Sequence, residues 1–419
     1  MKKSPALFWL FIFFASTIVA QQFETDLPSN VGFNPERIDR IDEVINRAIA
    51  NKEVPGVVAL VARNGKIAYQ KSFGYADMES QKPMHDDAIF RIASMTKAIT
   101  TTGVMLLYEH GLFKLNDPIS KYIPEFKNPQ VLVEADSLGN ILKTEPAKRE
   151  IRIVDLLSHS SGICYGHRPS KLQKVYRKNG IVGGLNHKDI KLEDHIKKLA
   201  KLPLLFSPGT NFEYSLSTDV LGYLCEIISG KPFDQFLNDE IFVPLKMKDT
   251  YFFLPEEKAS RLVPLYAFDK KERLKKLEKN RKYNPNFPTD GAKSYFSGGG
   301  GLSSTAYDYA RFIQMLLNNG ELDGVRILSR KSVELMQTPR IDMNNNGSKE
   351  FALGFRVITD LGEFGEIGSA GTYAWGGAYY TSFWIDPKEN LIGVLMSQIR
   401  PARSDLNMKF KQMVYQALE

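Results

Sequence analysis

Residues 57–73 have the sequence VVALVARNGKIAYQKSF, which predicts an antiparallel β-hairpin. Residues 57–62 are apolar and rich in valine, as in a buried strand, and Asn64-Gly65 is a typical two-residue hairpin turn. Residues 67–73 then form the partner strand. Before the hairpin, Asn34-Pro35-Glu36 predicts a helix start, because a capping residue precedes a proline in the first turn. The chain therefore begins with a helix and a hairpin.

The far end of the chain shows a related pattern. Apolar stretches predict three strands and a closing amphipathic helix, at residues 352–358, 381–385, 391–396 and 405–418. The middle of the chain has helical spacing, with helices expected at residues 99–110, 154–157, 219–228, 233–237 and 307–317. We therefore predict the α+β class, with one antiparallel sheet closed by the two ends of the chain and a helical insertion between them.

The composition is that of a globular protein. Of the 419 residues, 43% are hydrophobic and 25% are charged, which excludes a mostly disordered, a collagen-like or a polytopic membrane protein. The length predicts one large domain or a domain with a large insertion. Two cysteines are too few for a four-cysteine metal site, and the six histidines lack the H-E-x-x-H spacing, so neither a metal nor a cofactor is expected. Cys164 and Cys225 are expected to be free thiols, although an oxidising compartment permits a disulfide.

Residues 1–20 predict a cleaved secretory signal peptide. Lys2-Lys3 precede an apolar stretch over residues 6–20 that ends on a small residue, and these are the three parts of such a signal. The stretch is shorter than the roughly 20 residues that cross a bilayer, so no membrane span is expected after cleavage. The mature protein, residues 21–419, is expected to be periplasmic or secreted.

The positive net charge does not predict nucleic-acid binding. The 55 basic and 48 acidic residues give +7, and without Lys2 and Lys3 the charge is +5. Many basic residues lie in one run, residues 270–282, which glutamates interrupt. A run of mixed sign is typical of a solvated surface, so neither a nucleic acid nor another polyanion is the expected partner.

Ser94 is the candidate nucleophile, in the segment Ile92-Ala-Ser-Met-Thr-Lys97 at the start of an apolar helix. Side chains three positions apart share a helical face, so Lys97 is expected to reach the Ser94 hydroxyl. Apolar neighbours are expected to lower the pKa of Lys97 so that it accepts the serine proton. A capping serine and a surface lysine explain an isolated S-x-x-K equally well. This one, however, is the only S-x-x-K in the chain, and its helix is apolar on nearly every side.

Two further segments contain candidate site residues. Tyr214 precedes another helix, and a tyrosine there shuttles protons if its hydroxyl reaches a cleft beside a cation. Gly376 and Gly377 precede a strand, and paired glycines let the backbone approach a ligand closely. Taken singly, a structural tyrosine and an ordinary glycine turn explain these segments as well.

Two other patterns are weaker. The glycine run 298–301 lacks the Gly-Lys-Ser/Thr ending of a phosphate-binding loop, so we interpret it as a close-packed turn. A histidine-based triad through His159 lacks support, because the chain contains no G-x-S-x-G.

In this order, the segments resemble the serine β-lactamase and penicillin-binding-protein superfamily, in particular its class C-like branch with the family VIII carboxylesterases. Residues 156–162 resemble that branch's L-L-x-H-x-S-G, and residues 208–222 its P-G-x-x-F-x-Y-S-x-x-x-x-x-L-G. Residues 298–319 are similar to its G-G-x-G-L-x-S-T-x-x-D-Y-x-R-F segment, and residues 384–398 to its W-x-D-P-x-x-x-L-I-G-V-L-M-x-Q. The resemblance extends over about residues 35–418.

The resemblance implies a fold of two lobes. An antiparallel sheet flanked by helices would occupy about residues 30–90 and 295–419, and an all-α lobe about residues 91–294.

The resemblance also implies roles for the candidate residues. Ser94 would be the acylated nucleophile, Lys97 its proton acceptor and Tyr214 the second proton-transfer group. Trp375-Gly376-Gly377 falls where the family has K-T-G and would contact the substrate. The backbone N–H groups of Ser94 and Ala378 would form the oxyanion hole.

Two positions depart from the family's pattern. Leu216 replaces the asparagine of Y-x-N, and Trp375 replaces the lysine of K-T-G. In β-lactamases and D-Ala-D-Ala peptidases that lysine adds charge where the substrate carboxylate lies, and losing such a contact costs on the order of 1.5–3 kcal/mol. A wall of indole and isobutyl groups instead suits the acyl or alcohol part of a neutral ester, and both variants resemble those of the esterase subgroup. Tyr380, where a glycine is common in the branch, is expected to narrow the cleft further.

The sequence therefore predicts a secreted serine hydrolase that cleaves small carboxylic esters through an acyl-enzyme on Ser94. The nearest alternative is a β-lactamase or D-alanyl-D-alanine carboxypeptidase with an unusual site. A non-catalytic penicillin-binding or receptor-type module is the third, against which the intact Ser94, Lys97 and Tyr214 argue. The loops at residues 165–185 and 264–293 are expected to line the cleft.

Overall fold

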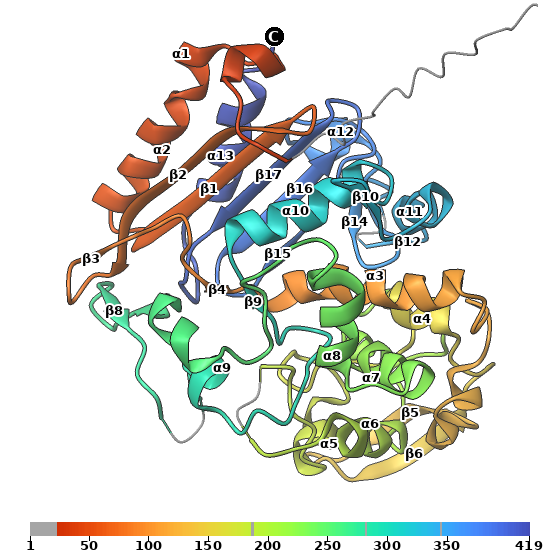
Figure 1. Ribbon diagram of the computed structural model, residues 1–419. Helices are drawn as coiled ribbons and strands as arrows, with labels where there is room; N and C mark the ends of the chain where they lie inside the picture. Colours follow the sequence, from red (N-terminus) through yellow and green to blue (C-terminus); the bar gives the residue numbers. More distant parts are fainter. Residues whose placement is uncertain (1–22, 186–187, 281–282, 344–345) are drawn as a thin grey trace, which may run out of the picture.

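A nine-stranded antiparallel sheet forms one half of the molecule (Figure 1). The computed structural model describes residues 23–185, 188–280, 283–343 and 346–419, so the predicted signal peptide lies outside the described residues. The strand order is β12-β13-β14-β15-β16-β17-β1-β2-β3. The strands are β1 (Gly56–Arg63), β2 (Lys66–Asp77), β3 (Lys82–Pro83), β12 (Ile341–Asp342), β13 (Lys349–Phe351), β14 (Arg356–Ile358), β15 (Tyr373–Gly377), β16 (Thr381–Asp386) and β17 (Leu391–Met396).

The two ends of the chain meet in this sheet, as predicted. The first strand, β1, pairs with β2 on one side and with β17 on the other, so that Val58 lies opposite both Ser72 and Met396. Asn64 and Gly65 both have positive φ, +54° and +73°, which is the backbone that a two-residue hairpin turn of the predicted type requires. The α+β class and the antiparallel sheet are therefore confirmed.

Strand β1 is buried on both faces of the sheet. Val58 and Leu60 face the main core, whereas Val57, Ala59 and Val61 face a second apolar cluster. Helices α1 (Pro35–Ile38), α2 (Arg40–Ala50) and α13 (Leu406–Tyr415) cover the second cluster, and α10 (Ala306–Leu317) packs on the opposite face (Figure 1). The sheet therefore separates two helical layers.

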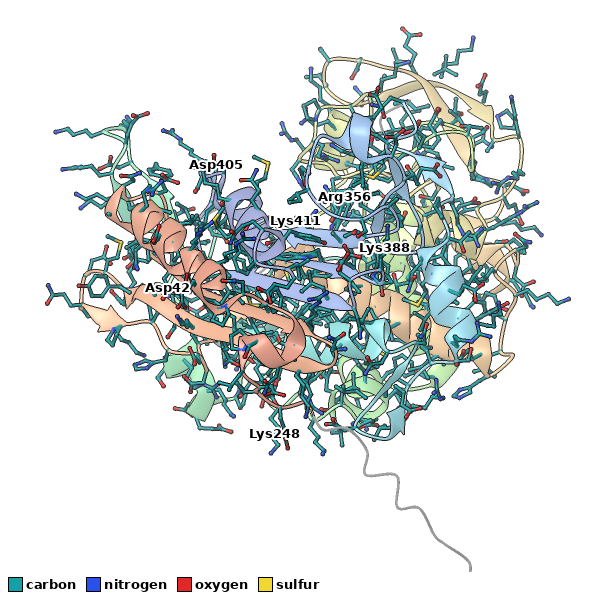
Figure 2. All side chains as sticks on the ribbon, turned by 90° about the horizontal axis from the view of Figure 1, so that it is seen from above. Asp42, Lys248, Arg356, Lys388, Asp405 and Lys411 are labelled. Carbon is teal, nitrogen blue, oxygen red and sulfur yellow. The ribbon has the colours of Figure 1, made fainter. Side chains whose placement is uncertain are left out.

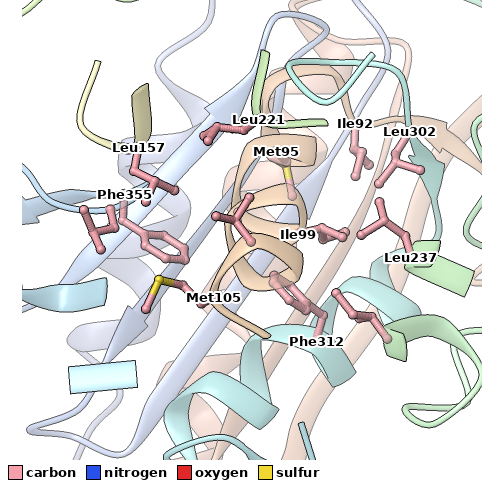
Figure 3. Packing of buried hydrophobic residues seen from close by; sticks show 14 of the residues in the cluster. Ile92, Met95, Ile99, Met105, Leu157, Leu221, Leu237, Leu302, Phe312 and Phe355 are labelled. Carbon is pink, nitrogen blue, oxygen red and sulfur yellow. The ribbon is translucent and has the colours of Figure 1, made fainter. Parts of the chain in front are cut away.

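Helix α3 (Thr96–Glu109) is the centre of the other half of the molecule. Its side chains are buried from Thr96 to Leu107, on every face. Figure 3 shows Ile99 and Met105 of this helix packed among Leu221, Leu237 and Phe312 from three other helices. The helices of this half and of the sheet edge are α4 (Ile153–Leu157), α5 (Gln173–Lys178), α6 (Leu192–Ala200), α7 (Ser217–Ser229), α8 (Phe233–Leu237), α9 (Phe287–Asp290), α11 (Arg330–Gln337) and α12 (Leu361–Phe364).

The inserted part is not wholly helical, which corrects the prediction. It contains two additional antiparallel pairs, in which the strands are β5 (Gln130–Ala135) with β6 (Ile141–Pro146) and β7 (Tyr266–Phe268) with β8 (Leu274–Lys276). The β5–β6 hairpin turns at Gly139, which has φ of +82°. Strand β6 is largely exposed, and the apolar run of β5 covers only residues 131–133, which is too short to separate this hairpin from a loop. Short pairs join β4 (Phe90–Arg91) to β9 (Ser303–Ser304) and β10 (Glu321–Leu322) to β11 (Val325–Arg326).

Of the strand predicted at residues 352–358, only β14 forms, and residues 352–355 are a tight turn that connects it to β13. Gly354 in this turn has φ of +83°, and a Cβ there would lie 2.4 Å from the hydroxyl oxygen of Thr101 on α3. The Gly354 N–H donates to the carbonyl of Leu157 at 3.1 Å. The turn thus docks the sheet on the central helix, and only glycine fits there.

We expect Gly354→Ala to lower the free energy of unfolding by about 2–3 kcal/mol, because it combines backbone strain with overpacking. Gly230→Ala is the matched control, since Gly230 also has positive φ, +69°, but no atom within 4 Å of an added Cβ. There we expect a loss of only about 1 kcal/mol. Chemical denaturation of both variants tests this, and equal losses would contradict it.

Cys164 and Cys225 are both buried and both free, as the sequence favoured. Among the described residues, no helix combines the length and the apolar character needed to span a bilayer.

Candidate active site

Ser94 lies in η2 (Ala93–Met95), a single turn that leads directly into α3. The preceding Ala93 has φ of +43°, a left-handed conformation that is uncommon for alanine and typical of functional sites. The turn is anchored because the N–H of Ile92 donates to the carbonyl of Leu302 at 3.0 Å. Ser94 itself is only half-buried, so its hydroxyl is accessible at the start of a rigid helix.

Lys97 is completely buried one turn further along α3. Its ammonium donates hydrogen bonds to the hydroxyl of Tyr165 at 3.1 Å and to the carbonyl of Gly299 at 2.6 Å. It also lies 4.5 Å from the ring centroid of Tyr214. In the described part of the chain no hydrogen bond joins Lys97 to Ser94, so the lysine faces the two tyrosines rather than the serine.

The prediction that burial lowers the pKa of Lys97 is wrong. Burial does oppose the charged form, but the oxygens of Tyr165 and Tyr214 outweigh this effect, and the pKa of Lys97 lies above its ordinary value. The side chain is therefore an ammonium at neutral pH, and an ammonium has three donors and no acceptor. In this geometry the Lys97 side chain donates to both of its hydrogen-bond partners and lies next to the phenols.

Tyr214 connects the predicted segments. It lies just before α7, and its hydroxyl accepts a hydrogen bond from the indole N–H of Trp375 at 3.2 Å. Its ring packs against Trp375 at 5.3 Å and against His159 at 4.8 Å between centroids. The adjacent N–H of Glu213 donates to the carbonyl of His159 at 2.8 Å. The segment around His159 therefore positions Tyr214, and Trp375 contacts it directly.

His159 has a structural role in this arrangement. It is buried, and its Nδ1 lies 3.0 Å from the hydroxyl oxygen of Ser215. Burial, together with the charges of Lys97 and Arg168, holds the pKa of His159 well below its usual range. It is a neutral side chain that supports the loop, which agrees with the prediction that no histidine triad operates here.

Strand β15 ends beside the nucleophile turn. A Cβ at Gly377 would lie 2.4 Å from the carbonyl oxygen of Ile92, so only glycine permits this approach. The next residue, Ala378, consequently lines the same cavities as Ser94. This placement suits the predicted oxyanion hole, in which two backbone N–H groups face one developing negative oxygen.

Two cavities meet at the candidate nucleophile, and Ser94, Tyr214 and Ala378 line both. The first cavity, of about 530 Å³, runs past Trp375, Gly376 and Gly377 to Arg356 and Lys411. Figure 2 shows the last two side by side. The second cavity, of about 330 Å³, is lined by residues of the 165–185 loop and by Tyr283, which confirms that both predicted loops reach the cleft.

Two residues that were predicted to shape the substrate cleft, Leu216 and Tyr380, do not line either cavity. Leu216 is fully buried in the main core, so the apolar wall beside Ser94 is made by Trp375 without it. Tyr380 belongs to the second core cluster, and its hydroxyl donates to the carbonyl of Ser404 at 3.0 Å. The prediction that Tyr380 narrows the cleft is therefore wrong. Its φ of +69° explains why a glycine suits this position.

Sequence reasoning missed two residues beneath the site. Tyr165 accepts a hydrogen bond from Lys97, and Asp219 lies under the glycine turn 298–301. The Asp219 carboxylate accepts from Ser297 at 2.6 Å, and burial raises its pKa. It thereby fixes the turn whose Gly299 carbonyl accepts from Lys97. The only available signal was that Asp219 lies in the segment that contains Tyr214.

We expect Trp375→Phe to lower kcat for an ester substrate roughly fivefold with little change in KM, since it keeps an aromatic ring but removes the hydrogen bond to Tyr214. Steady-state kinetics across pH separates this positioning role from lost packing, because only the former shifts the pH profile. A mutant that changes KM alone would contradict it.

Comparisons with known proteins identify the family of this chain. A model of the Beta-lactamase family matches residues 41–416. Esterase EstB of Burkholderia gladioli is 29% identical, over 85% of this chain and 89% of its own. N-acetylmuramyl-L-alanine amidase of Bacillus subtilis is 27% identical, over 85% and 84%.

Solved structures are similar as well. The structure of EstCE1, a hydrolase with promiscuous acyltransferase activity, superposes with a TM-score of 0.79 at 27% identity. The superposition covers 91% of this chain and 99% of the other. The chain therefore belongs to the β-lactamase family and is a serine hydrolase of the β-lactamase and penicillin-binding-protein fold.

Proposed function

We propose that this protein cleaves small carboxylic esters through an acyl-enzyme on Ser94. The observation that carries the proposal is the position of Trp375. Its indole lines the first cavity beside Ser94, and its only polar atom donates to Tyr214. Where β-lactamases have a cation, this wall is apolar, which suits a neutral ester. The names of the relatives EstB and EstCE1 support the same class of substrate.

The proposed reaction has two halves. Tyr214 acts as the base, and the Lys97 ammonium lies 4.5 Å from the centroid of its ring. Tyr214 takes the proton of Ser94 as the serine oxygen attacks the ester carbonyl carbon. The N–H groups of Ser94 and Ala378 stabilise the resulting oxyanion. When the tetrahedral intermediate collapses, the bond to the alcohol oxygen breaks, and that oxygen receives the proton from Tyr214.

The second half repeats this sequence with water. Tyr214 takes a proton from water, the resulting hydroxide attacks the acyl carbon, and the bond to Ser94 breaks. The proton returns to the serine oxygen, which releases the acid and restores the free hydroxyl. The proton passes through Tyr214 in both halves, while Lys97 keeps its charge throughout.

We also propose that the protein works outside the cytoplasm, which the charged and apolar residues 2–20 support. N-terminal sequencing of the protein from an extracytoplasmic fraction should find a start close to Gln21. A start at Met1 would contradict it.

One observation favours the alternative of a D-alanyl-D-alanine carboxypeptidase or amidase. Arg356 and Lys411 line the far end of the first cavity, where a substrate carboxylate would find cations. Glu366 lines the same end, however, and its carboxylate lies 3.9 Å from the ammonium of Lys411. This partial compensation leaves the ester as the better-supported substrate.

One assay separates these functions. The mature protein and Ser94→Ala are offered p-nitrophenyl butyrate, a chromogenic cephalosporin and a D-Ala-D-Ala peptide. We expect the ester to have the highest kcat/KM and to lose its turnover in Ser94→Ala. Faster hydrolysis of the cephalosporin or the peptide would overturn the assignment as an esterase. A stable covalent adduct without turnover would favour a non-catalytic penicillin-binding or receptor-type module.

A further inference from the structure

We propose that the second cavity selects substrates that carry a carboxylate on the part of the ester that enters it. This inference rests on the proposed esterase function and specifies its substrate class. It starts from two arginines, Arg168 and Arg400, which line the second cavity together with Ser94. Among the described residues that line this cavity, none is acidic. The cavity that leads to the nucleophile therefore has an unbalanced positive charge.

Both arginines are exposed, and other groups orient their side chains. The guanidinium of Arg168 lies 5.5 Å from the ring centroid of Tyr214, and that of Arg400 lies 5.8 Å from the ring centroid of Tyr379. The Arg400 N–H donates to the carbonyl of Tyr266 at 2.9 Å, which fixes the backbone at the cavity rim. A guanidinium that stacks on a ring keeps its N–H donors available for a ligand.

In the described part of the chain, neither arginine forms an ion pair within 4.0 Å. The carboxylate of Glu213 acts on Arg168 through space, but Glu213 does not line the cavity. The two charges therefore face the cavity without a carboxylate of the protein between them.

A titrating neighbour reports the same field. His167 lines the second cavity, and its pKa is lowered first by burial and then by the charges of Arg400, Arg168 and Lys97. Cations from two separate loops and from the buried lysine thus act at one place. The positive potential that these cations create at His167 also attracts an anionic group of a substrate.

The first cavity differs in this respect. Its cations, Arg356 and Lys411, share the wall with Glu366. A carboxylate would encounter an acidic wall residue there, whereas no acidic residue lines the second cavity. Guanidinium groups bind carboxylates through paired N–H donors, which gives both affinity and orientation. A half-ester of a dicarboxylic acid, or an ester of a hydroxy acid, fits a cavity with the reactive serine at one end and arginines at its rim.

Two matched ester pairs test the inference. In the acyl pair, 4-nitrophenyl hydrogen adipate has a free carboxylate, and 4-nitrophenyl adipamate replaces it with a neutral amide of the same length. In the alcohol pair, 6-acetoxyhexanoate is compared with 6-acetoxyhexanamide. We expect the charged member of one pair to have a kcat/KM roughly tenfold higher at low salt, decreasing with ionic strength. The pair that responds identifies which side of the ester enters the second cavity.

Variants assign the preference to its source. The double variant Arg168→Gln/Arg400→Gln is expected to lose the preference. Arg403→Gln removes the same unit charge at an exposed residue outside both cavities and is expected to keep it. Equal rates within both pairs would overturn the inference. A preference that survives the double variant but disappears in Lys411→Gln would overturn it too, because the first cavity would then be its source.

A binding measurement keeps the inference testable if the esterase function fails. Calorimetry with Ser94→Ala compares ethyl hydrogen adipate with ethyl adipamate. If wild type turns over no ester, the proposed function is wrong, and this pair still decides the inference. Tighter binding of the anion, lost in the added Arg168→Gln/Arg400→Gln changes, supports it, and equal binding overturns it.

Discussion

Replacing Ser94 with alanine is expected to reduce kcat/KM for p-nitrophenyl butyrate by about 10⁴-fold or more. The reason is that the variant lacks the oxygen that forms the acyl-enzyme, so water would have to attack the ester directly. The oxyanion hole and the cavities remain, because the N–H of residue 94 is retained and Ala93, Gly377 and Ala378 are untouched. Residual hydrolysis is therefore expected to come only from binding and polarisation of the ester.

Two controls make this result specific. Ser120→Ala removes another half-buried serine hydroxyl, one that donates to Glu150 at 3.0 Å and lies outside both cavities. We expect it to keep kcat/KM within about twofold, in line with surface substitutions away from a site. The Tm of Ser94→Ala should match that of wild type. Retention of more than a tenth of wild-type activity in a folded Ser94→Ala protein would contradict the assignment.

Replacing Lys97 with methionine is expected to reduce kcat about 10³-fold, within the range that positioned proton-transfer groups contribute. Methionine has a similar unbranched length, so the packing of α3 is largely kept while the charge is removed. The cation beside the Tyr214 ring is lost, and a phenolate there would no longer be stabilised.

The pH dependence gives this prediction a sign. The pKa of Lys97 is raised, so its proton is held more tightly in the folded than in the unfolded protein. The Lys97 cation is fully present below the ordinary lysine pKa. In the folded protein it is lost only as pH rises through the raised pKa of Lys97. Wild-type activity should therefore show no rise with pH that reports loss of the Lys97 proton. Lys275→Met, at an exposed lysine of β8, is the matched control and should be near wild type. Substantial activity in a folded Lys97→Met protein would contradict the role assigned to the charge.

The sheet was predictable because its signals are local. Asn64-Gly65 determines the hairpin turn, and the continuous apolar run of β1 is what a strand buried on both faces requires. Strands at both ends of the chain predicted one sheet closed by the termini, and β1 does pair with β17. The pair of β5 with β6 lacks a comparable pattern, because β6 is largely exposed and the apolar run of β5 is only three residues long.

The candidate site was predictable in part. The motifs identified Ser94, Tyr214 and Trp375, and the structure brings them to one place. The protonation state of Lys97 was not predictable from apolar neighbours alone, because it depends on Tyr165, which comes from a loop 68 residues away. The burial of Leu216 shows the same limit: sequence alignment with a motif locates a backbone position, whereas the surrounding packing decides where the side chain lies.

The most direct measurement of the central claim is the location of the acyl group. The protein is mixed with excess p-nitrophenyl butyrate, quenched in acid, digested with trypsin and analysed by fragmentation mass spectrometry. Cleavage after Arg91 and Lys97 releases Ile92-Ala-Ser-Met-Thr-Lys97 as one short peptide. We predict that this peptide is heavier by one butyryl group, that fragmentation places the group on Ser94 and not on Thr96, and that Ser94→Ala shows none. A butyryl group on another residue, or rapid turnover with no adduct on this peptide, would contradict the account.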